Sequence, residues 1–242
     1  MYTVMINSFI AGFATIIGCL IVLLIGKPSE KVLAWLLGFA TGIMLTVVII
    51  DLLPSAYTYS NFFIALLGFF LGNLILLTLD IFLSWLPLLN GVKQGNNRLI
   101  KMGYLIAIGI ALHDLPEGIA IAVGYSATPE LGLIIALAIG LHNIPEGMAT
   151  AAPLKMGGMN SFKILALTTL VSLITPLGAY LGFIIISISK SLIGLLLAFA
   201  GGAMTFIVHN ELWPESKRRH PNYSRLGAVC GIVLMLCVGL IH

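Results

Sequence analysis

The chain contains very little charge. Of its 242 residues, only 9% are Asp, Glu, Lys or Arg, while 60% are hydrophobic, and the mean hydropathy is +1.10. A soluble domain carries about 25% charged residues because its surface faces water. The low charge therefore excludes a soluble globular protein. We expect residues 1–242 to form a single transmembrane domain in contact with the lipid bilayer.

Thiol chemistry and nucleic-acid motifs are also scarce. The three cysteines, Cys19, Cys230 and Cys237, lie in apolar stretches without CxxC spacing, which argues against a thiolate metal site or a redox centre. The net charge of +3 is small, and the sequence lacks a basic motif typical of nucleic-acid binding. The N-terminus has no basic region before its long apolar stretch, so we expect a retained first helix.

Long apolar stretches dominate the rest of the chain. A helix needs about 20 apolar residues to cross a bilayer, and helices satisfy their own backbone hydrogen bonds in hydrocarbon. The sequence therefore predicts an all-α membrane protein with eight transmembrane helices. The predicted spans are residues 4–26, 32–53, 61–86, 102–125, 131–152, 164–187, 192–213 and 225–241.

The basic residues predict the orientation. With eight spans, 11 of the 12 Lys and Arg residues fall in loops on one side, and only Lys190 falls on the other. Because cytoplasmic loops are enriched in Lys and Arg, this pattern predicts that both termini are extracytoplasmic in a multi-pass plasma-membrane protein. The eleven are Lys27, Lys31, Lys93, Arg98, Lys101, Lys155, Lys163, Lys217, Arg218, Arg219 and Arg225.

The fourth and fifth predicted spans carry the same motif. They read IAIGIALHDLPEGIAIAVGY and IALAIGLHNIPEGMATAAPL, and the two His-Asp/Asn-x-Pro-Glu-Gly copies are 29 residues apart. Adjacent spans run in opposite directions, so the pair forms a short inverted repeat. Transporters with inverted repeats bind their substrate near the bilayer midplane, between the related elements.

The spacing within each motif places its polar side chains on one helix face. The His and Glu are four residues apart, and the Asp or Asn beside the His widens that face. Pro116 and Pro145 free backbone carbonyls one turn earlier and can bend each helix, while Gly118 and Gly147 allow another helix to approach. Together the motifs supply two imidazoles, three carboxylates and one amide, from His113, Asp114, Glu117, His142, Asn143 and Glu146.

Three acids at mid-span need a compensating charge. One charged side chain at a helix centre costs about 2.5–3.5 kcal/mol on insertion scales. A bound divalent cation would remove that cost, and imidazole with carboxylate suits Zn, Fe, Ni or Mn, whereas the lack of thiolate argues against Cu(I). The alternative is a buried His–carboxylate network that only locks two helices together. Two copies at the same depth favour the metal site.

The two HxxPEG motifs resemble those of the ZIP family of metal transporters, especially its short bacterial GufA-like branch. The resemblance extends over the whole chain, because the eight spans, the outward termini and the motif positions all match. It implies that the six motif residues bind the transported ion, with zinc favoured and iron, manganese and cadmium as alternatives. It also implies transport into the cytoplasm, a homodimer, and an elevator-like movement of one helix bundle against another.

The chain departs from the family pattern at two positions. Many relatives have Asn where this chain has Asp114, which adds a negative charge. Relatives with a two-metal centre have a Glu where this chain has Thr175, in the sequence SLITPLG. We therefore expect one high-affinity ion. Residues 87–101 contain no histidine, so we do not expect a metal-sensing loop.

Other polar positions suggest an entrance and an exit for the ion. Asp51 lies near the outer end of the second span, and Met44 lies deeper in a stretch that resembles the family's second helix. The alternative for Met44 is a packing role. Near the inner end of the seventh span, HNELWPES supplies candidate exit residues that Asp80 could join. The alternative is that Glu211 and Glu215 only face water beside Lys217 and Arg218. The exit candidates are His209, Glu211 and Glu215.

Two other functions compete with a carrier. An intramembrane metal-dependent hydrolase would also bury His and carboxylates around a metal that activates water. The sequence lacks the HExxH motif, and inverted symmetry suits alternating access better than a one-sided active site. A channel usually forms its pore from repeated subunits or a carbonyl filter, and no such feature is present.

Overall fold

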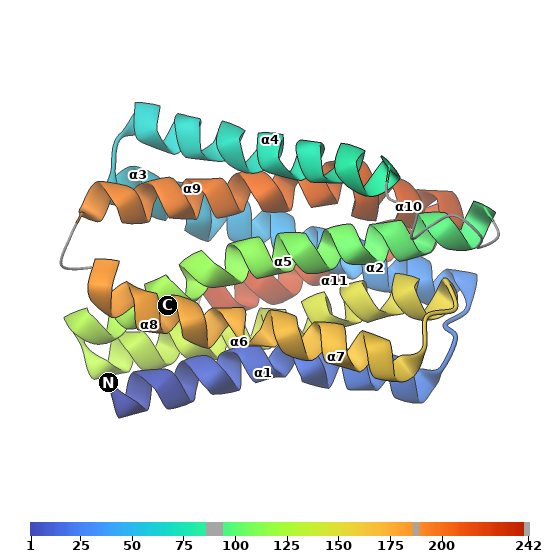
Figure 1. The fold of residues 1–242 in the computed structure, drawn as a ribbon, viewed down its shortest axis with the longest axis horizontal. Coiled ribbons are helices and arrows are strands. Elements are labelled where there is room, and N and C mark those ends of the chain that lie inside the picture. Colours follow the sequence, from blue (N-terminus) through green and yellow to red (C-terminus); the bar gives the residue numbers. More distant parts are fainter. Residues whose placement is uncertain (86–93, 186–188, 240–242) are drawn as a thin grey trace.

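The computed structural model describes residues 1–85, 94–185 and 189–239, and every regular element among them is helical. Figure 1 shows the helices lying roughly parallel along the long axis of the molecule. The elements are α1 (Tyr2–Ile25), α2 (Glu30–Val47), η1 (Val48–Leu52), α3 (Leu53–Tyr59), α4 (Phe62–Trp85), α5 (Gln94–Ala127), α6 (Pro129–Met156), α7 (Ser161–Ser172), α8 (Ile174–Ile185), α9 (Lys190–Ile207), η3 (Val208–Leu212), α10 (Trp213–Arg219) and α11 (Pro221–Gly239).

Eight of the described helical segments are long and apolar enough to cross a membrane, which confirms the predicted fold class. The sixth span differs from the prediction because it is broken at Leu173, between α7 and α8. Pro176 follows three residues later and has no backbone N–H for the carbonyl of Ser172, so the α-helical hydrogen bonding is interrupted there. The predicted spans at 61–86, 164–187 and 225–241 also extend beyond the described residues.

Several polar segments that were expected to form loops are helical. The helix α5 begins at Gln94, and Trp213–Arg219 forms α10, so Arg98 and Lys101 lie on a helix and not in a connection. Hydropathy marks only the lipid-facing part of a helix, and these polar ends continue past it. Lys93, which was assigned to the same connection, lies outside the described residues.

Side-chain caps determine where several helices begin. Ser29 accepts a hydrogen bond from the backbone N–H of Val32, and Thr128 accepts one from Leu131 at the start of α6. Asn160 accepts one from Phe162 at the start of α7. These side chains satisfy backbone donors that have no partner within the helix, so short polar breaks are enough to reverse the chain.

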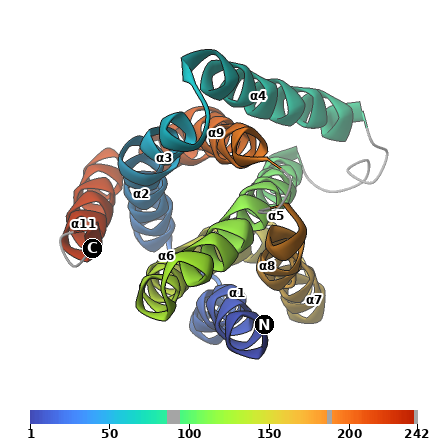
Figure 2. The same ribbon diagram turned by 90° about the vertical axis from the view of Figure 1, so that its left-hand side faces the viewer.

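The helices form two bundles (Figure 2). In the first, α1 packs on α6, α7 and α8, and α5 packs on α6 and α8; we call it the motif bundle because it contains both motifs. In the second, α2 packs on α10 and α11, and α9 packs on α3 and α4; we call it the flanking bundle. The two bundles meet chiefly where α5 lies against α9 and α2 lies against α6.

The closest helix approaches lie within each bundle. A Cβ at Gly147 or Gly118 would clash with the carbonyl oxygens of Thr15 or Thr175, and a Cβ at Gly42 would clash with that of Ala228. Each of these pairs joins helices of one bundle. Between the bundles, Gly109 of α5 faces the side chains of Ile207 and Leu76 and not the backbone of a neighbouring helix. Backbone-to-backbone packing thus holds each bundle together.

The flanking bundle contains a second internal repeat, at an offset of 160 residues. The sequence LLGFATGIM at 36–44 corresponds to LLAFAGGAM at 196–204. Each copy continues into a π-helical turn, Val48–Leu52 or Val208–Leu212, with Pro54 or Pro214 two residues beyond it. Since the two helices run in opposite directions, equivalent residues lie toward opposite ends of the molecule. Asp51 in the first copy is equivalent to Glu211 in the second.

We name the two ends of the molecule by their content. The terminal face is the end at which α1 begins and α11 ends, and the basic face is the opposite end, at which α5 begins and α10 ends (Figure 1). Of the described Lys and Arg residues, only Lys190 belongs to the terminal face. The other described basic residues lie in or next to the connections at the basic face.

Candidate metal centre

The two motifs lie in the middle of α5 and α6, which both continue through their internal prolines, Pro116 and Pro145. None of the six polar motif residues is more than 4% exposed. Both helices therefore direct their polar side chains into the interior and away from lipid. The structure places all six in the middle of the motif bundle, three on α5 and three on α6.

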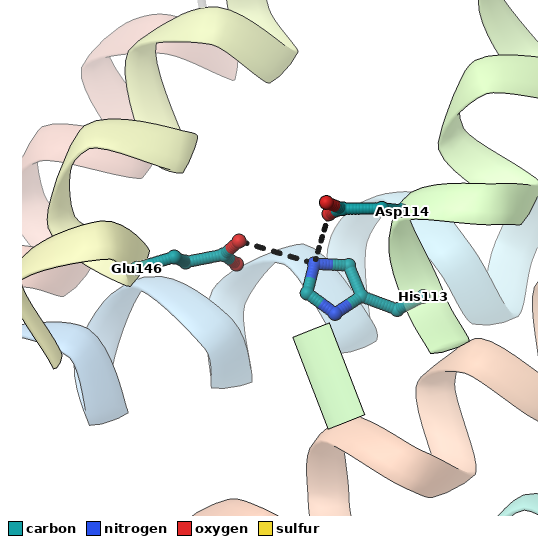
Figure 3. A group of neighbouring side chains, drawn as sticks. All are labelled: His113, Asp114 and Glu146. Carbon is teal, nitrogen blue, oxygen red and sulfur yellow. Dashed lines mark ion pairs between the residues drawn. The ribbon is translucent and has the colours of Figure 1, made fainter. Parts of the chain in front are cut away.

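His113 faces the carboxylates of Asp114 and Glu146 (Figure 3) and is oriented by its own helix. Its Nδ1 lies 3.2 Å from the carbonyl oxygen of Gly109, and because a carbonyl only accepts, Nδ1 carries the hydrogen. In the neutral ring the lone pair is then on Nε2. That atom lies 3.2 Å from Oε2 of Glu146, 3.5 Å from Oδ1 of Asp114 and 3.8 Å from Oε1 of Glu117. A backbone-bonded imidazole with its other nitrogen facing acids is a typical metal ligand.

A second contact joins the motifs directly. Nε2 of His142 lies 2.9 Å from Oε1 of Glu117, so an imidazole of α6 reaches a carboxylate of α5. Asn143 is held by a third helix, because its Nδ2 donates a 3.0 Å hydrogen bond to the carbonyl of Ala11 on α1. This bond fixes the amide and leaves its side-chain oxygen as the unpaired atom.

The spacing of three ligand atoms matches a small cation. His113, Asp114 and Glu146 each offer one ligand atom, and these atoms lie within 4.8 Å of one another. Ligands about 2.1 Å from a tetrahedral zinc ion are about 3.4 Å apart. The separations of 3.2 and 3.5 Å around Nε2 of His113 are close to that value. Imidazole nitrogen with carboxylate oxygen is also a suitable ligand set for zinc, iron or manganese.

The site has more polar atoms than hydrogen bonds. Eight buried side-chain atoms of the six residues have no hydrogen-bond partner among the described residues, including both carboxylate oxygens of Asp114 and of Glu146. Leaving a buried polar group unpaired costs about 1–3 kcal/mol, and more when it is charged. A divalent cation would accept several of these lone pairs at once. A ligand that supplies positive charge would therefore suit this cluster.

Two glycines admit neighbouring helices beside the acids. The prediction that Gly118 and Gly147 allow close approach is confirmed. The backbone of α8 lies where a Cβ on Gly118 would be, and the backbone of α1 lies where a Cβ on Gly147 would be. The approach of α8 buries Thr175, whose hydroxyl has no hydrogen-bond partner among the described residues. A neutral hydroxyl adds no charge there, so the carboxylates of the centre are those of Asp114, Glu117 and Glu146.

A cavity of about 350 Å³ connects the cluster with the terminal face. Its inner end is formed by Glu117 and His142, and its outer part is lined by Asp51 and by Tyr59 at the end of α3. Apolar side chains make up most of the wall. Asp51 is exposed, so its predicted position near the outer end of the second span is consistent with the structure. Met44 is instead fully buried in the hydrophobic core, as expected for the packing alternative.

The predicted exit residues lie at the basic face, where most of them have charged neighbours. His209 is exposed and Glu211 is partly buried. Glu215 is only 1% exposed and accepts hydrogen bonds from both Arg218 and Arg219, so the alternative that it faces water is wrong.

The sequence reasoning missed two partners of these acids. Lys101 Nζ lies 2.6 Å from Oδ1 of Asp80, and Arg98 Nε lies 3.5 Å from Oε2 of Glu215. Both basic residues had been assigned to a loop. The internal repeat of the flanking bundle was a sequence signal that could have drawn attention to this region. It makes Glu211 the counterpart of Asp51, and Glu211 lies near both Lys101 and Arg98.

Comparison with known proteins shows the family of the chain. Residues 90–239 match the family described as ZIP Zinc transporter, and this range includes both motifs. A protein named zinc transporter ZupT from Corynebacterium glutamicum is 34% identical over 248 residues, covering 94% of each chain. Another of that name, from Lysinibacillus sphaericus, is 32% identical over 97% of this chain and 95% of its own.

A plant protein is also similar. Zinc transporter ZTP29 from Arabidopsis thaliana is 34% identical over 226 residues, which cover 86% of this chain and 82% of its own. The similarity therefore extends over nearly the whole length of the chain, well beyond the two motifs. This eight-helix membrane protein belongs to the ZIP zinc transporter family.

Proposed function

We propose that this protein carries divalent transition-metal ions across the plasma membrane, with zinc as the preferred ion. Membership of the ZIP zinc transporter family and the similarity to proteins named zinc transporters support the transport of a divalent metal. Iron, manganese and cadmium are further candidate substrates, because imidazole and carboxylate ligands accept most divalent ions of this series.

The single observation that carries the proposal is the buried cluster on α5 and α6. His113, Asp114 and Glu146 present converging ligand atoms, and Glu117 links them to His142. The cluster lies at mid-helix and at the inner end of a cavity, so an ion can reach it from one side of the membrane. We assign ion binding to these residues together with Asn143, and we expect one ion per chain.

The two-bundle arrangement supports an elevator-like mechanism. Close backbone packing lies within each bundle, and the bundles meet through side chains, so either bundle can move as a unit. The cluster belongs entirely to the motif bundle and would move with it. In alternating access, that movement would close the path from the terminal face and open one to the basic face.

The direction follows from the charges. The positive-inside rule places the basic face in the cytoplasm, so the cavity opens to the outside and transport is directed inward. In this arrangement Asp51 is an entrance residue, and Asp80, His209, Glu211 and Glu215 surround the exit. The exposed apolar surface of α4 in the described chain is compatible with a homodimer as well as with lipid.

Flux measurements on the purified protein in liposomes test this function. The initial rate of uptake should saturate with zinc concentration, and Fe(II), Mn and Cd should compete with zinc. A rate that rises in proportion to the driving force without saturation would indicate a channel. If no ion moves, the cluster would be structural or catalytic, and hydrolysis of membrane substrates would become the next assay.

A further inference from the structure

Two ion pairs connect the bundles at the basic face. Lys101 and Arg98 lie on α5 of the motif bundle, whereas their partners, Asp80 on α4 and Glu215 on α10, belong to the flanking bundle. The Lys101–Asp80 pair is short, at 2.6 Å, and the Arg98–Glu215 pair measures 3.5 Å. Other ion pairs nearby, such as Arg219–Glu30, join helices of the flanking bundle alone.

A third acid of the flanking bundle lies in the same cluster. Glu211 interacts electrostatically with Asp80, Lys101, Arg98 and Glu215. Glu215 also pairs with Arg218 and Arg219 of its own helix, whereas the cations that face Asp80 and Glu211 in this cluster, Lys101 and Arg98, come from the opposite bundle. If α5 moved away, Asp80 would lose Lys101 and Glu211 would lose both of these cations, while Glu215 would keep its own two arginines. The charges therefore favour the arrangement in which the bundles are in contact at this face.

Among residues 1–85, 94–185 and 189–239, the ion pairs that join the two bundles lie at the basic face and not at the terminal face. Asp51 is the repeat equivalent of Glu211, but it lines the cavity, and none of the described residues that line that cavity is Lys or Arg. The two related halves of the flanking bundle thus differ in one respect. Basic residues of α5 contact the acids of one half, whereas Asp51 of the other half lies in the wall of the cavity.

Apolar packing fills the space between the ion pairs and the metal centre. Ile207 of α9 and Leu76 of α4 pack against Gly109, one turn of α5 toward the basic face from His113. Lys101 lies two further turns along the same helix. An ion at the centre would therefore meet an apolar seal first and the ion pairs beyond it.

We propose that the Lys101–Asp80 and Arg98–Glu215 pairs form a latch that keeps the basic face closed while the cavity at the terminal face is open. The latch rests on the proposed function, because only alternating access requires the basic face to open. Release of the ion then requires both pairs to break as α5 moves relative to α4 and α10.

The exposure of the pairs suits a reversible latch. The side chains of Lys101 and Asp80 are 24% and 27% exposed, and that of Arg98 is 53% exposed. Partly exposed ion pairs contribute modestly, so each is expected to change the ratio of closed to open molecules up to about fivefold. Together they are strong enough to bias the equilibrium and weak enough to break in every transport cycle.

Cysteine accessibility tests the latch without using a metal. In a background with Cys19, Cys230 and Cys237 replaced by Ala, Ile207→Cys reports opening of the basic face and Ser55→Cys reports the cavity. The rate of modification by N-ethylmaleimide is measured for each reporter in the full-length protein. The double variant Lys101→Gln/Arg98→Gln removes the latch.

The matched control is Glu30→Gln, which removes an ion pair of similar chemistry within the flanking bundle. The double variant should raise the Ile207→Cys rate about threefold to tenfold without raising the Ser55→Cys rate, while the control leaves both unchanged. A second variant exchanges the two charges of one pair, Lys101→Asp/Asp80→Lys, and leaves Arg98 in place. Because the pair can still form, its Ile207→Cys rate should stay within about twofold of the parent rate.

Two outcomes would overturn the latch. An unchanged Ile207→Cys rate in the double variant would show that the pairs do not hold the face closed. A rise at both reporters would indicate general loosening of the fold. Because labelling needs no metal, a protein that moved no ion could still pass this test, so failure of the latch and failure of the proposed function are distinguishable.

Discussion

Nε2 of His142 on α6 lies 2.9 Å from Oε1 of Glu117 on α5. This contact joins the two copies of the inverted repeat, and Oε1 of the same glutamate lies 3.8 Å from Nε2 of His113. Glu117 therefore faces both imidazoles and also forms part of the cavity wall. In the proposed function, an ion that arrives through the cavity would meet this glutamate and His142 before it reached His113, Asp114 and Glu146.

Zinc bound to the protein should have only nitrogen and oxygen ligands. The candidate ligands are imidazoles, carboxylates and an amide, and none of the three cysteines belongs to the cluster. X-ray absorption at the zinc edge should show distances of about 2.0–2.2 Å and no sulfur at about 2.3 Å. Titration should give one zinc per chain. A sulfur shell, or zinc binding that disappears in the cysteine-free variant, would contradict the assignment.

Asp114→Asn should have opposite effects on zinc binding and on the stability of the metal-free protein. Both carboxylate oxygens of Asp114 are buried and lack hydrogen-bond partners among the described residues, so the charge is costly without a cation. The amide should weaken zinc binding about tenfold to 100-fold and raise the thermal stability of the metal-free form. Calorimetric titration and thermal unfolding in detergent measure the two effects.

A matched control for this variant is Glu130→Gln, which removes one carboxylate from the exposed first turn of α6. It should change neither quantity. Unaltered zinc affinity in Asp114→Asn would exclude this residue from the ligands, and a less stable metal-free protein would mean that the carboxylate has a structural role.

Gly147→Ala should destabilise the packing of α1 on α6. A Cβ at this position would overlap the carbonyl oxygen of Thr15, and overpacking of this kind costs about 1–3 kcal/mol. Gly140 on the same helix is the control, because its Cβ would lie 3.5 Å from the Cα of Ala11, an ordinary contact. Gly140→Ala should be neutral or slightly stabilising, since Ala favours helix. Equal loss in both variants, measured by unfolding in detergent, would contradict the packing account.

Removal of all three cysteines should leave zinc transport intact. Cys19 is buried on α1, and Cys230 and Cys237 lie on α11, outside the motif bundle. The triple Ala variant is therefore expected to keep a zinc uptake rate within about twofold of the parent, because packing changes of this size cost little. Loss of uptake with normal expression would indicate that a thiol takes part in transport.

Hydropathy alone was sufficient to predict the number of spans, because the lipid core requires long apolar segments. It could not locate the polar ends of α5 and α10, which form ion pairs with other helices, such as Arg98 with Glu215 and Arg219 with Glu30. The interruption at Leu173 depends on where Pro176 falls within an otherwise apolar stretch. Hydropathy is insensitive to such a break because both sides are equally apolar.

The residue types and spacing of the motifs were sufficient to predict which side chains share one helix face. They could not predict which atoms meet, because that depends on the relative rotation of α5 and α6. The contacts from His142 to Glu117 and from His113 to Glu146 cross between these helices. Nor could they predict the bond from Asn143 to Ala11, since that partner comes from α1, more than 130 residues away.

Zinc uptake by Glu117→Ala and His142→Ala in liposomes, measured beside the parent protein and Glu130→Gln, tests the central claim most directly. We predict saturable uptake by the parent and by Glu130→Gln, and at least about a 100-fold loss in both site variants, because each removes a ligand and leaves its partner buried and unpaired. Uptake by Glu117→Ala or His142→Ala at the rate of the parent would show that the ion does not pass through the α5–α6 site.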